Sequence, residues 1–191
     1  ALRRLRLQKT YSLINIVGMA LGLACTLLIF IWVKDELGYD RFHTKADRVF
    51  RVVFSTSDDG SPSNANGSFG VGPALKKDFP EVLETVRVRK MERNPKRYVG
   101  YQDKKFYEPR FFFAESSLFT VFDFPLLSGD AATALTDPGS IVLAEAMAQK
   151  YFESDDPLGK VIAVDPYNDG KLMPFRVTGV AKNVPRQSHF H

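Results

Sequence analysis

Residues 13–33 read LINIVGMALGLACTLLIFIWV, an uninterrupted apolar run that governs the interpretation of the rest of the chain. At about 1.5 Å per residue, a helix of this length spans roughly 31 Å, close to a bilayer's hydrocarbon thickness of about 30 Å. Lys34-Asp35-Glu36 follows the run, and four basic residues precede it: Arg3, Arg4, Arg6 and Lys9. We therefore predict a membrane-spanning helix with a folded domain tethered behind it.

The distribution of charge predicts the orientation of this helix. Residues 1–12 carry four of the 26 basic side chains and none of the 22 acidic ones, so the remainder has no net charge. Basic residues beside a span stay on the cytoplasmic side, which predicts a cytoplasmic N-terminus and an extracytoplasmic domain. A nucleic-acid-binding face needs basic residues clustered in the folded domain, so the high pI does not indicate a nucleic-acid partner.

Three other interpretations of the apolar run fit less well. The hydrophobic region of a cleaved signal peptide has about 7 to 15 residues and ends at small residues, whereas this run is longer and ends at charges. A lipoprotein signal around Cys25 has Gly22 where leucine is expected, and seven apolar residues follow the cysteine. A buried helix of a soluble protein rarely needs an apolar run of this length behind a basic flank.

One face of the predicted span carries small and polar residues, namely Asn15, Gly18, Gly22 and Thr26. They are spaced three to four residues apart and therefore lie on one side of a helix. Small residues allow another helix to approach closely, and asparagine or threonine can donate hydrogen bonds across the contact. We expect this face to pack on protein, with a chance GxxxG in a glycine-rich span as the competing explanation.

The part of the chain after the span has the composition of a folded domain without disulfides. The chain is 45% hydrophobic and contains 16 Phe and 7 Tyr, which is enough to bury a core. Its single cysteine, Cys25, lies within the predicted span, so the outer domain has neither a disulfide nor thiol chemistry.

Local patterns predict a mixture of strands and helices after the span. Alternation and turn residues predict strands at 47–54, 84–89, 98–101, 105–107 and 111–114, and a loop near 55–70. A first helix is predicted at 73–79. A second, short helix is predicted to begin at a cap formed by Ser116 or Ser117 and to end at Phe122. Arg87, Arg89, Lys90, Arg93, Lys96 and Arg97 form a basic cluster. We interpret this cluster as a solvated strand face, with contact to anionic headgroups or an acidic partner as the alternative.

The last third of the chain contains the clearest element pattern. A strand at 140–143, a helix at 145–152 and a strand at 160–164 predict a right-handed βαβ crossover. The turn Asn168-Asp169-Gly170 predicts a hairpin with a returning strand at 173–182. The expected fold class is α+β: an N-terminal transmembrane helix followed by a mixed α/β domain that contains a βαβ unit.

A search for chemical sites yields no catalytic, cofactor or metal residues. Neither Gly159-Lys160 nor Gly170-Lys171 has the spacing of a P-loop. Asp165, Asn168 and Asp169 resemble a calcium loop, but Tyr167 stands at a ligand position and Arg176 replaces the bidentate glutamate, so a hairpin turn explains them better. His189 and His191 are only two candidate ligands, and His43 is alone in its loop. We therefore expect no enzyme.

Five strings along the chain resemble one family, in that family's order. They are INIVGMALGL at 14–23, YDRFH at 39–43 with VFRV at 49–52, FTVFDFPLLSGD at 119–130, DPLGK at 156–160, and VTGV at 177–180 with SHF at 188–190. Together they resemble an FtsX-like permease with a MacB-like periplasmic core domain, the membrane subunit of a type VII ABC transporter.

The resemblance implies a domain organisation, a location and partners. It divides the chain into a basic cytoplasmic N-terminus at 1–12, a transmembrane helix and stalk at 13–37, and a periplasmic core domain at 38–191 that is incomplete at its C-terminus. It places the protein in the bacterial inner membrane. Its implied partners are a cytoplasmic ABC ATPase, a second permease subunit in a homodimer or heterodimer, a periplasmic adaptor or substrate protein, and membrane lipid. No nucleic acid is implied.

The implied mechanism is mechanical: a partner hydrolyses ATP, and the spans relay the motion to the periplasmic domain for export, extraction or signalling. The stalk after Val33 is the first link of such a relay, and a helix continuing through 34–37 transmits motion better than a flexible linker. A single-pass sensor or an anchored extracytoplasmic binding module is the alternative that the residues leave open.

Overall fold

The computed structural model describes residues 9–54, 67–90 and 96–190. The chain divides into two compact units, one formed by residues 1–41 with 187–189 and the other by residues 42–186 with 190–191. The predicted basic N-terminus at 1–12 and the predicted loop near 55–70 lie mostly outside the described residues. The two units are described separately below.

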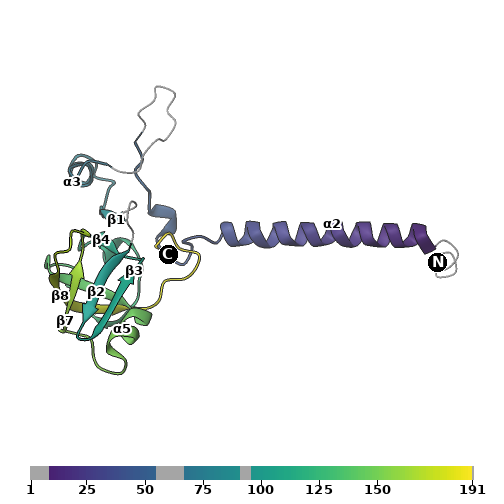
Figure 1. The fold of residues 1–191 in the computed structure, drawn as a ribbon. Coiled ribbons are helices and arrows are strands. Elements are labelled where there is room, and N and C mark those ends of the chain that lie inside the picture. Colours follow the sequence, from purple (N-terminus) through teal and green to yellow (C-terminus); the bar gives the residue numbers. More distant parts are fainter. Residues whose placement is uncertain (1–8, 55–66, 91–95, 191) are drawn as a thin grey trace. The chain divides into compact units, whose positions relative to one another are not determined.

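The first unit contains one long helix, α2 (Lys9–Glu36), drawn as a continuous coil in Figure 1. It includes the whole apolar run, with a mean hydropathy of 2.5 over its most apolar window and no residue buried within the chain. Length and composition therefore make α2 a candidate membrane span, and the predicted helix over 13–33 is confirmed.

The second unit is built on a six-stranded sheet. Five strands follow the order β3-β2-β7-β8-β5: β3 (Lys104–Glu108), β2 (Arg97–Tyr101), β7 (Val161–Asp165), β8 (Met173–Ala181) and β5 (Leu126–Gly129). The sixth strand, β6 (Ser140–Ala144), also pairs with β8. Hairpins join β2 to β3 and β7 to β8, as predicted from the turns between them. The mixed α/β class is therefore confirmed.

The predicted βαβ crossover differs in its parallel partner. Helix α5 (Glu145–Phe152) follows β6 with the predicted bounds, but β6 pairs in parallel with β8, and β8 pairs antiparallel with β7. The chain therefore runs from β6 through α5 and β7 before it reaches the parallel partner of β6. The second strand was assigned incorrectly because spacing alone does not distinguish a hairpin strand from the strand that completes a crossover.

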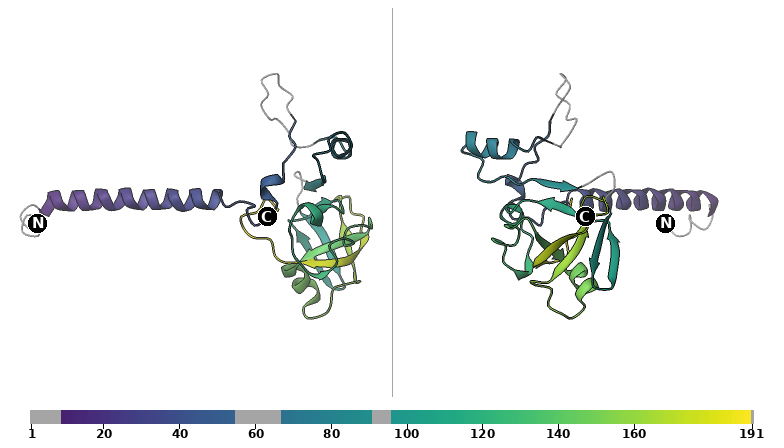
Figure 2. Two further views of the ribbon diagram at one scale, coloured as in Figure 1. Left: turned by 180° about the vertical axis from the view of Figure 1, so that it is seen from behind. Right: turned by 60° about the vertical axis from the view of Figure 1, so that its left-hand side comes forward.

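The core of this unit lies between α5 and the sheet (Figure 2). Ile162 and Val164 on β7 have no exposed surface, and Tyr151 and Phe152 on α5 pack against them. The remaining buried members come from β2, β6, β8 and α5: Val99, Leu143, Ala148, Val177 and Val180. Burial of this apolar surface provides the main driving force for folding of the unit.

Shorter elements complete the second unit. They are the 3-10 turn η1 (Ala46–Arg48), helices α3 (Val71–Asp78) and α4 (Leu118–Val121), and the antiparallel pair β1 (Val88–Lys90) and β4 (Phe112–Ala114). The strand predicted at 84–89 is thus reduced to β1. Ser117 occupies the N-cap position of α4, as predicted, but its hydroxyl donates to the Thr85 carbonyl oxygen over 2.7 Å and makes no capping hydrogen bond to the helix.

The strand predicted at 47–54 is also wrong. Its first residues form η1, and residues 49–53 belong to no strand. Phe50 is 84% exposed. Alternating apolar residues indicate a strand only where a neighbouring strand pairs with them, and none of the described strands does so here.

Candidate functional site

The helix-packing face predicted on α2 is available for contact in this chain. All four of its residues, Asn15, Gly18, Gly22 and Thr26, are exposed. A methyl group added at Gly18 or Gly22 meets nothing within 4 Å. The Thr26 hydroxyl donates to the Gly22 carbonyl oxygen over 2.9 Å, so the helix itself already satisfies this donor. Packing of this face on another helix stays a prediction.

Helix α2 passes into a hydrogen-bonded turn at residues 37–41. The Leu37 amide donates to the Val33 carbonyl oxygen over 2.9 Å, and the Gly38 amide donates to the Asp35 carbonyl oxygen over 3.1 Å. The helix ends at Glu36, one residue before the stalk helix expected through Leu37. The backbone then turns at Asp40, which has a φ of 54°. The segment after the span is therefore a short ordered turn.

Three residues from the far end of the chain bind this turn. The Asp40 amide donates to the Gln187 carbonyl oxygen over 2.9 Å, and the His189 amide donates to Asp40 Oδ1 over 3.2 Å. The His189 ring contacts Asp40 Oδ2 through Nδ1 and lies edge-on to the Tyr39 ring at 5.0 Å. Gln187 Nε2 donates to Asp35 Oδ1 over 2.6 Å. Residues 187–189 thus belong to the first unit.

The electrostatics of this contact favour a charged Asp40. Burial raises the pKa of the Asp40 carboxyl, but hydrogen bonds from the His189 ring and amide and from Ser188 outweigh burial. The net result is a pKa below the ordinary value for aspartate. Asp40 is therefore a carboxylate at neutral pH that accepts hydrogen bonds from residues 149 positions away.

In the second unit, Asp123 fixes the beginning of the domain. Asp123 Oδ2 accepts 2.7 Å hydrogen bonds from both the amide and the hydroxyl of Thr44. Lys45 Nζ donates to the Thr120 carbonyl oxygen over 2.7 Å. The bonds from Thr44 lower the pKa of Asp123, although burial acts in the opposite direction. This contact joins residues 79 positions apart in the sequence.

His43 is an internal part of this contact and not the isolated loop residue that the sequence indicated. It is 5% exposed, and its Nδ1 accepts a 3.0 Å hydrogen bond from the Asp123 amide. Its ring packs near Phe122 and Phe124, with centroid distances of 5.2 and 5.1 Å. Phe190 contacts the same two rings at 4.9 and 5.0 Å. His43 and Phe190, which are far apart in the sequence, therefore contact the same two phenylalanine rings.

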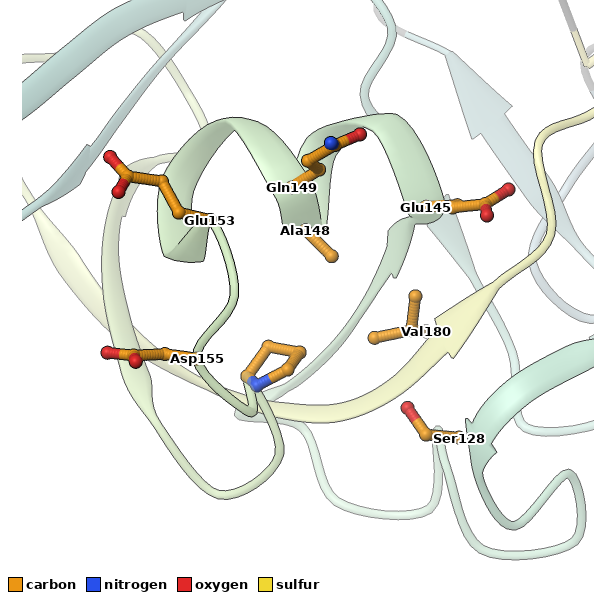
Figure 3. A pocket seen from close by; sticks show the side chains of 8 residues that line it. Ser128, Glu145, Ala148, Gln149, Glu153, Asp155 and Val180 are labelled. Carbon is orange, nitrogen blue, oxygen red and sulfur yellow. The ribbon is translucent and has the colours of Figure 1, made fainter.

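An open depression of about 380 Å³ lies beside α5 (Figure 3). Its lining includes the apolar residues Ala148, Val180 and Pro157 and the acidic residues Glu145, Glu153 and Asp155. Two of these acids are already bound: Glu153 pairs with Lys104 at 2.7 Å, and Glu145 accepts a bond from Asn183 Nδ2. The depression does not bring together groups suited to one reaction.

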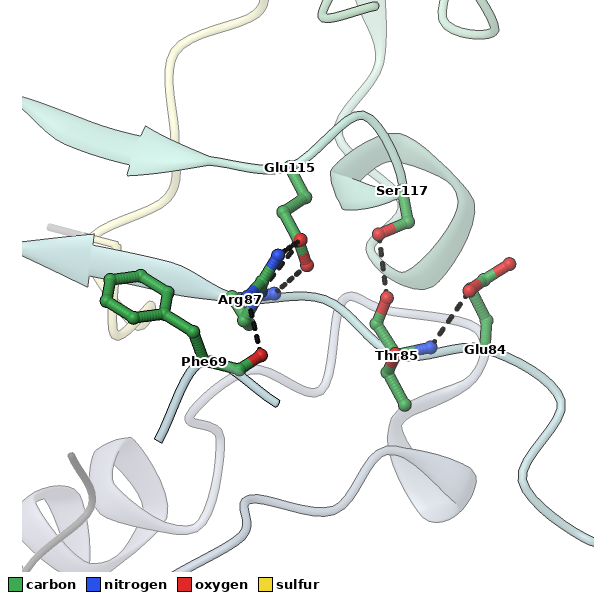
Figure 4. Close-up of polar contacts among 6 residues, drawn as sticks. All are labelled: Phe69, Glu84, Thr85, Arg87, Glu115 and Ser117. Atoms are coloured by element: carbon green, nitrogen blue, oxygen red, sulfur yellow. Dashed lines mark hydrogen bonds and ion pairs between the residues drawn. The ribbon is translucent and has the colours of Figure 1, made fainter. Parts of the chain in front are cut away.

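The basic cluster predicted around residues 87–97 is divided by the fold. Arg87 pairs with Glu115 and donates to the Phe69 carbonyl oxygen (Figure 4). The bonds from Arg87 lower the pKa of Glu115. Arg97 is only 2% exposed, and its Nε donates to the Pro166 carbonyl oxygen over 2.8 Å. Arg93 lies outside the described residues. The interpretation of one solvated basic face is therefore wrong for Arg97.

The residues that resembled metal ligands have other structural roles. Asp165 accepts hydrogen bonds from the amides of Asp169 and Gly170, which closes the predicted hairpin turn. His189 contacts Asp40, and His191 lies outside the described residues. Within residues 9–54, 67–90 and 96–190, no three His, Cys, Asp or Glu side chains gather as a metal site.

Comparison with known proteins gives one family match. The family model of the MacB-like periplasmic core domain matches residues 12–191. This match includes most of α2 together with the whole second unit. No curated protein sequence matches the chain.

The solved structures that are similar to this chain include the following three. A domain of a protein described as a permease from Porphyromonas gingivalis is 23% identical, with a TM-score of 0.48, over 61% of this chain and 46% of its own. The periplasmic region of MacB from Actinobacillus actinomycetemcomitans is 19% identical, with a TM-score of 0.48, and the match covers 69% of this chain and 57% of the MacB chain. The extracellular domain of the noncanonical ABC-type transporter YknZ from Gram-positive bacteria is 18% identical, with a TM-score of 0.37, and the match covers 51% of this chain and 47% of the YknZ chain. The chain thus spans about half the length of these structures.

Proposed function

The chain belongs to the family of MacB-like periplasmic core domains of ABC transporter-type permeases, and we propose that it acts in a permease subunit that couples a partner's ATP hydrolysis to motion of this domain. The motion serves export, extraction or signalling. The family is a transporter domain and not an enzyme class. The proposed chemistry therefore belongs to the partner, and the proposed work of this chain is mechanical.

The extent of the family match is the observation that carries this proposal. The match begins at residue 12, within α2, and continues to residue 191. A family whose members share both the apolar helix and the folded domain uses the helix as a lasting part of the protein, which argues against a removable signal peptide. A permanent connection between span and domain is what a mechanical relay requires.

The segment that follows α2 in the first unit is a short hydrogen-bonded turn, which supports a mechanical role for it. Only residues 37–42 separate the last helical residue, Glu36, from the buried His43. Hydrogen bonds hold this segment, including that from the Arg41 amide to the Gly38 carbonyl oxygen at 3.3 Å. A flexible linker dissipates displacement, whereas a hydrogen-bonded turn passes it on.

The proposed orientation places the N-terminus in the cytoplasm and the second unit in the periplasm, at the inner membrane. The four basic residues before the span support it through the positive-inside preference. Reporter fusions test this orientation: alkaline phosphatase fused after Ala181 should be active, and the same enzyme fused before Leu13 should be inactive. The reverse pattern contradicts the proposed orientation.

The proposed partners are a cytoplasmic ABC ATPase and a second permease subunit. The small residues Gly18 and Gly22 on the exposed face of α2 would allow a helix of the second permease subunit to approach closely. The test uses the complete native reading frame that contains this chain, purified in mild detergent from native membranes. We expect an ATPase subunit to be recovered with it. Recovery of none, while a reference permease from the same membranes keeps its ATPase, contradicts the proposal and favours a single-pass sensor.

A further inference from the structure

A second depression, of about 410 Å³, lies at the end of α2. All of its lining residues belong to the first unit. Three of them are apolar, two are basic and one is a glycine: Phe30, Val33, Leu37, Lys34, Arg41 and Gly38. Positions 30, 33, 34 and 37 fall on one side of a helix, which explains why side chains of both kinds share this depression. It therefore combines an apolar wall with two cationic groups.

The depression lies where the apolar run of α2 gives way to charged residues. Val33 is the last residue of the run, and Lys34 is the first charged residue after it. The headgroup region adds about 5 to 8 Å to each side of a bilayer's hydrocarbon core. At about 1.5 Å per residue, the chain from Lys34 to Leu37 rises about 6 Å. With α2 as a membrane span, Phe30 and Val33 therefore face lipid chains, and Lys34 lies at the depth of the headgroups.

Trp32 indicates the same depth independently. It is the only tryptophan of the chain, and it is 65% exposed. Tryptophan is enriched at membrane–water interfaces because its ring is large and apolar and also carries a hydrogen-bond donor. Trp32 precedes Val33 directly, so the interface that it indicates coincides with the level of the depression.

The two cations of the depression are available to a ligand. Lys34 and Arg41 are exposed, and neither side chain forms an ion pair with any residue that the structure describes. The acidic residues of the same segment do not line the depression. Asp35 accepts a 2.6 Å hydrogen bond from Gln187, and Asp40 contacts His189. The third acidic residue, Glu36, is likewise not among the lining residues.

We propose that this depression binds the headgroup of an anionic phospholipid at the membrane surface where α2 ends. Charge complementarity selects the headgroup, since Lys34 and Arg41 together offer two positive charges to one phosphate. Arginine suits this role because its planar guanidinium can donate two parallel hydrogen bonds to phosphate oxygens. Lysine suits it because its apolar stem can lie along the lipid while its ammonium group reaches the headgroup.

The apolar wall selects a lipid and not a free anion. Phe30 is 64% exposed and Leu37 is 60% exposed, so both side chains offer apolar surface that a lipid chain can cover. Covering such surface is favourable in proportion to its area, and inorganic phosphate provides no apolar part to do so. A zwitterionic phospholipid fits less well, because its own cationic group already neutralises the phosphate.

Photo-crosslinking in nanodiscs tests this assignment on the complete native reading frame that contains this chain. The probes are phosphatidylglycerol and phosphatidylcholine that carry the same diazirine on an acyl chain close to the glycerol. Each is added in trace amount to phosphatidylcholine nanodiscs, and mass spectrometry measures the yield on the peptide that covers residues 30–41. We expect the phosphatidylglycerol probe to give a several-fold higher yield. Equal yields from the two probes would overturn the proposal.

Substitution of the two cations should remove this preference. Lys34→Gln and Arg41→Gln should each lower the phosphatidylglycerol yield about five-fold, the factor for one basic side chain beside an anionic lipid. Lys34→Arg should retain most of the yield, because it keeps the charge. Lys9→Gln is the matched control, since Lys9 is a basic residue at the other end of the same helix. A loss in Lys9→Gln as large as in Lys34→Gln would show general attraction of anionic lipid and contradict a local site.

The apolar wall has its own test. Leu37→Ala keeps every charge but removes part of the wall, so it should lower the phosphatidylglycerol yield several-fold. A yield equal to that of the wild type would reduce the interaction to surface charge and overturn the proposed depression. Excess inorganic phosphate at constant ionic strength should leave the wild-type yield unchanged. Displacement of the probe by phosphate would show that a free anion is the ligand.

This inference rests on the part of the proposed function that makes α2 a membrane span. Alkaline carbonate extraction tests the span by itself, because a protein with a spanning helix stays in the membrane pellet. Release of the protein would refute the span. Retention together with equal yields from the two probes would refute only the lipid site. Low yields from both probes would show that another helix covers the depression, which also contradicts the proposal.

Discussion

Tyr151 on α5 donates a 2.8 Å hydrogen bond to Glu108 on β3, and both side chains are buried. Lys150 Nζ lies 2.7 Å from the same carboxylate oxygen. Burial, followed by the bond to Glu108, raises the pKa of Tyr151 well above its ordinary value, so its hydroxyl remains a donor across the accessible pH range. This contact attaches the helix to an edge strand of the sheet.

Replacing Tyr151 with phenylalanine should therefore destabilise the second unit. The loss should be about 1 to 2 kcal/mol, because a buried charged acceptor loses one of its two donors while Lys150 remains. Urea unfolding of the detergent-solubilised chain, followed by circular dichroism, measures the change. Tyr107→Phe is the control, because Tyr107 is 66% exposed. Loss of its hydroxyl group should change the free energy of unfolding by less than about 0.5 kcal/mol.

Gly129→Ala should be more damaging than Gly159→Ala. Both glycines have positive φ, at 90° and 75°, so both variants incur a backbone penalty of about 1 kcal/mol. At Gly129, however, the added methyl group clashes with the Thr178 carbonyl oxygen, whereas at Gly159 it meets nothing within 4 Å. The first variant should lose at least about 2 kcal/mol in the same unfolding assay. Equal losses would show that β5 and β8 separate readily.

The stability contributed by Asp123 should depend on pH. Hydrogen bonds from Thr44 lower its pKa in the folded chain, so its contribution is present above the unfolded value near 3.8 and is lost as pH falls through the lower folded value. Asp123→Asn should cost roughly 0.5 kcal/mol at pH 7, since solvent screens an exposed pair, and the difference from the wild type should disappear in acid. Unfolding temperatures from pH 7 down to pH 2 measure this. A difference that persists at the lowest pH contradicts the assignment.

The small-residue face of α2 should matter for assembly and not for insertion. Gly18→Leu combined with Gly22→Leu meets open space in this chain, so membrane insertion and folding should be unchanged. Close approach of a partner helix should be blocked, with recovery of the partner subunits reduced at least several-fold. Ala20→Leu adds a similar volume on the opposite side of the helix and should leave recovery unchanged. If the double variant assembles as well as this control, the small-residue face does not pack on a partner helix, and α2 acts only as a membrane anchor.

Elements with local signals were predictable from the sequence. The bounds of α5 were predicted correctly because its apolar residues recur with helical spacing between two strands. The β7–β8 hairpin was predictable because Asn168 and Gly170 adopt the positive φ values that their turn requires. The apolar run of α2 needed only its length and composition.

Features that depend on distant partners were not predictable in the same way. The strand expected at 47–54 has the correct alternation, but none of the strands in the described part of the chain pairs with it, and alternation does not reveal whether a partner exists. Arg97 looked like part of a solvated cluster, yet the Pro166 carbonyl oxygen, 69 residues away, holds its guanidinium inside. The contact of Asp40 with His189 had no local signal, although both residues lay in the strings that resembled the family.

Strand β8 has a consequence for the order in which the protein can be made and folded. Among the described strands, β5 and β6 pair only with β8, and β7 loses one of its two neighbours without it. A nascent chain that has emerged only to residue 172 therefore holds β5 and β6 without their partner strand and β7 with one open hydrogen-bonding edge, long after α2 has left the ribosome. The membrane helix can be in place before the sheet exists, and completion of the sheet depends on nine residues that are synthesised near the end of this chain.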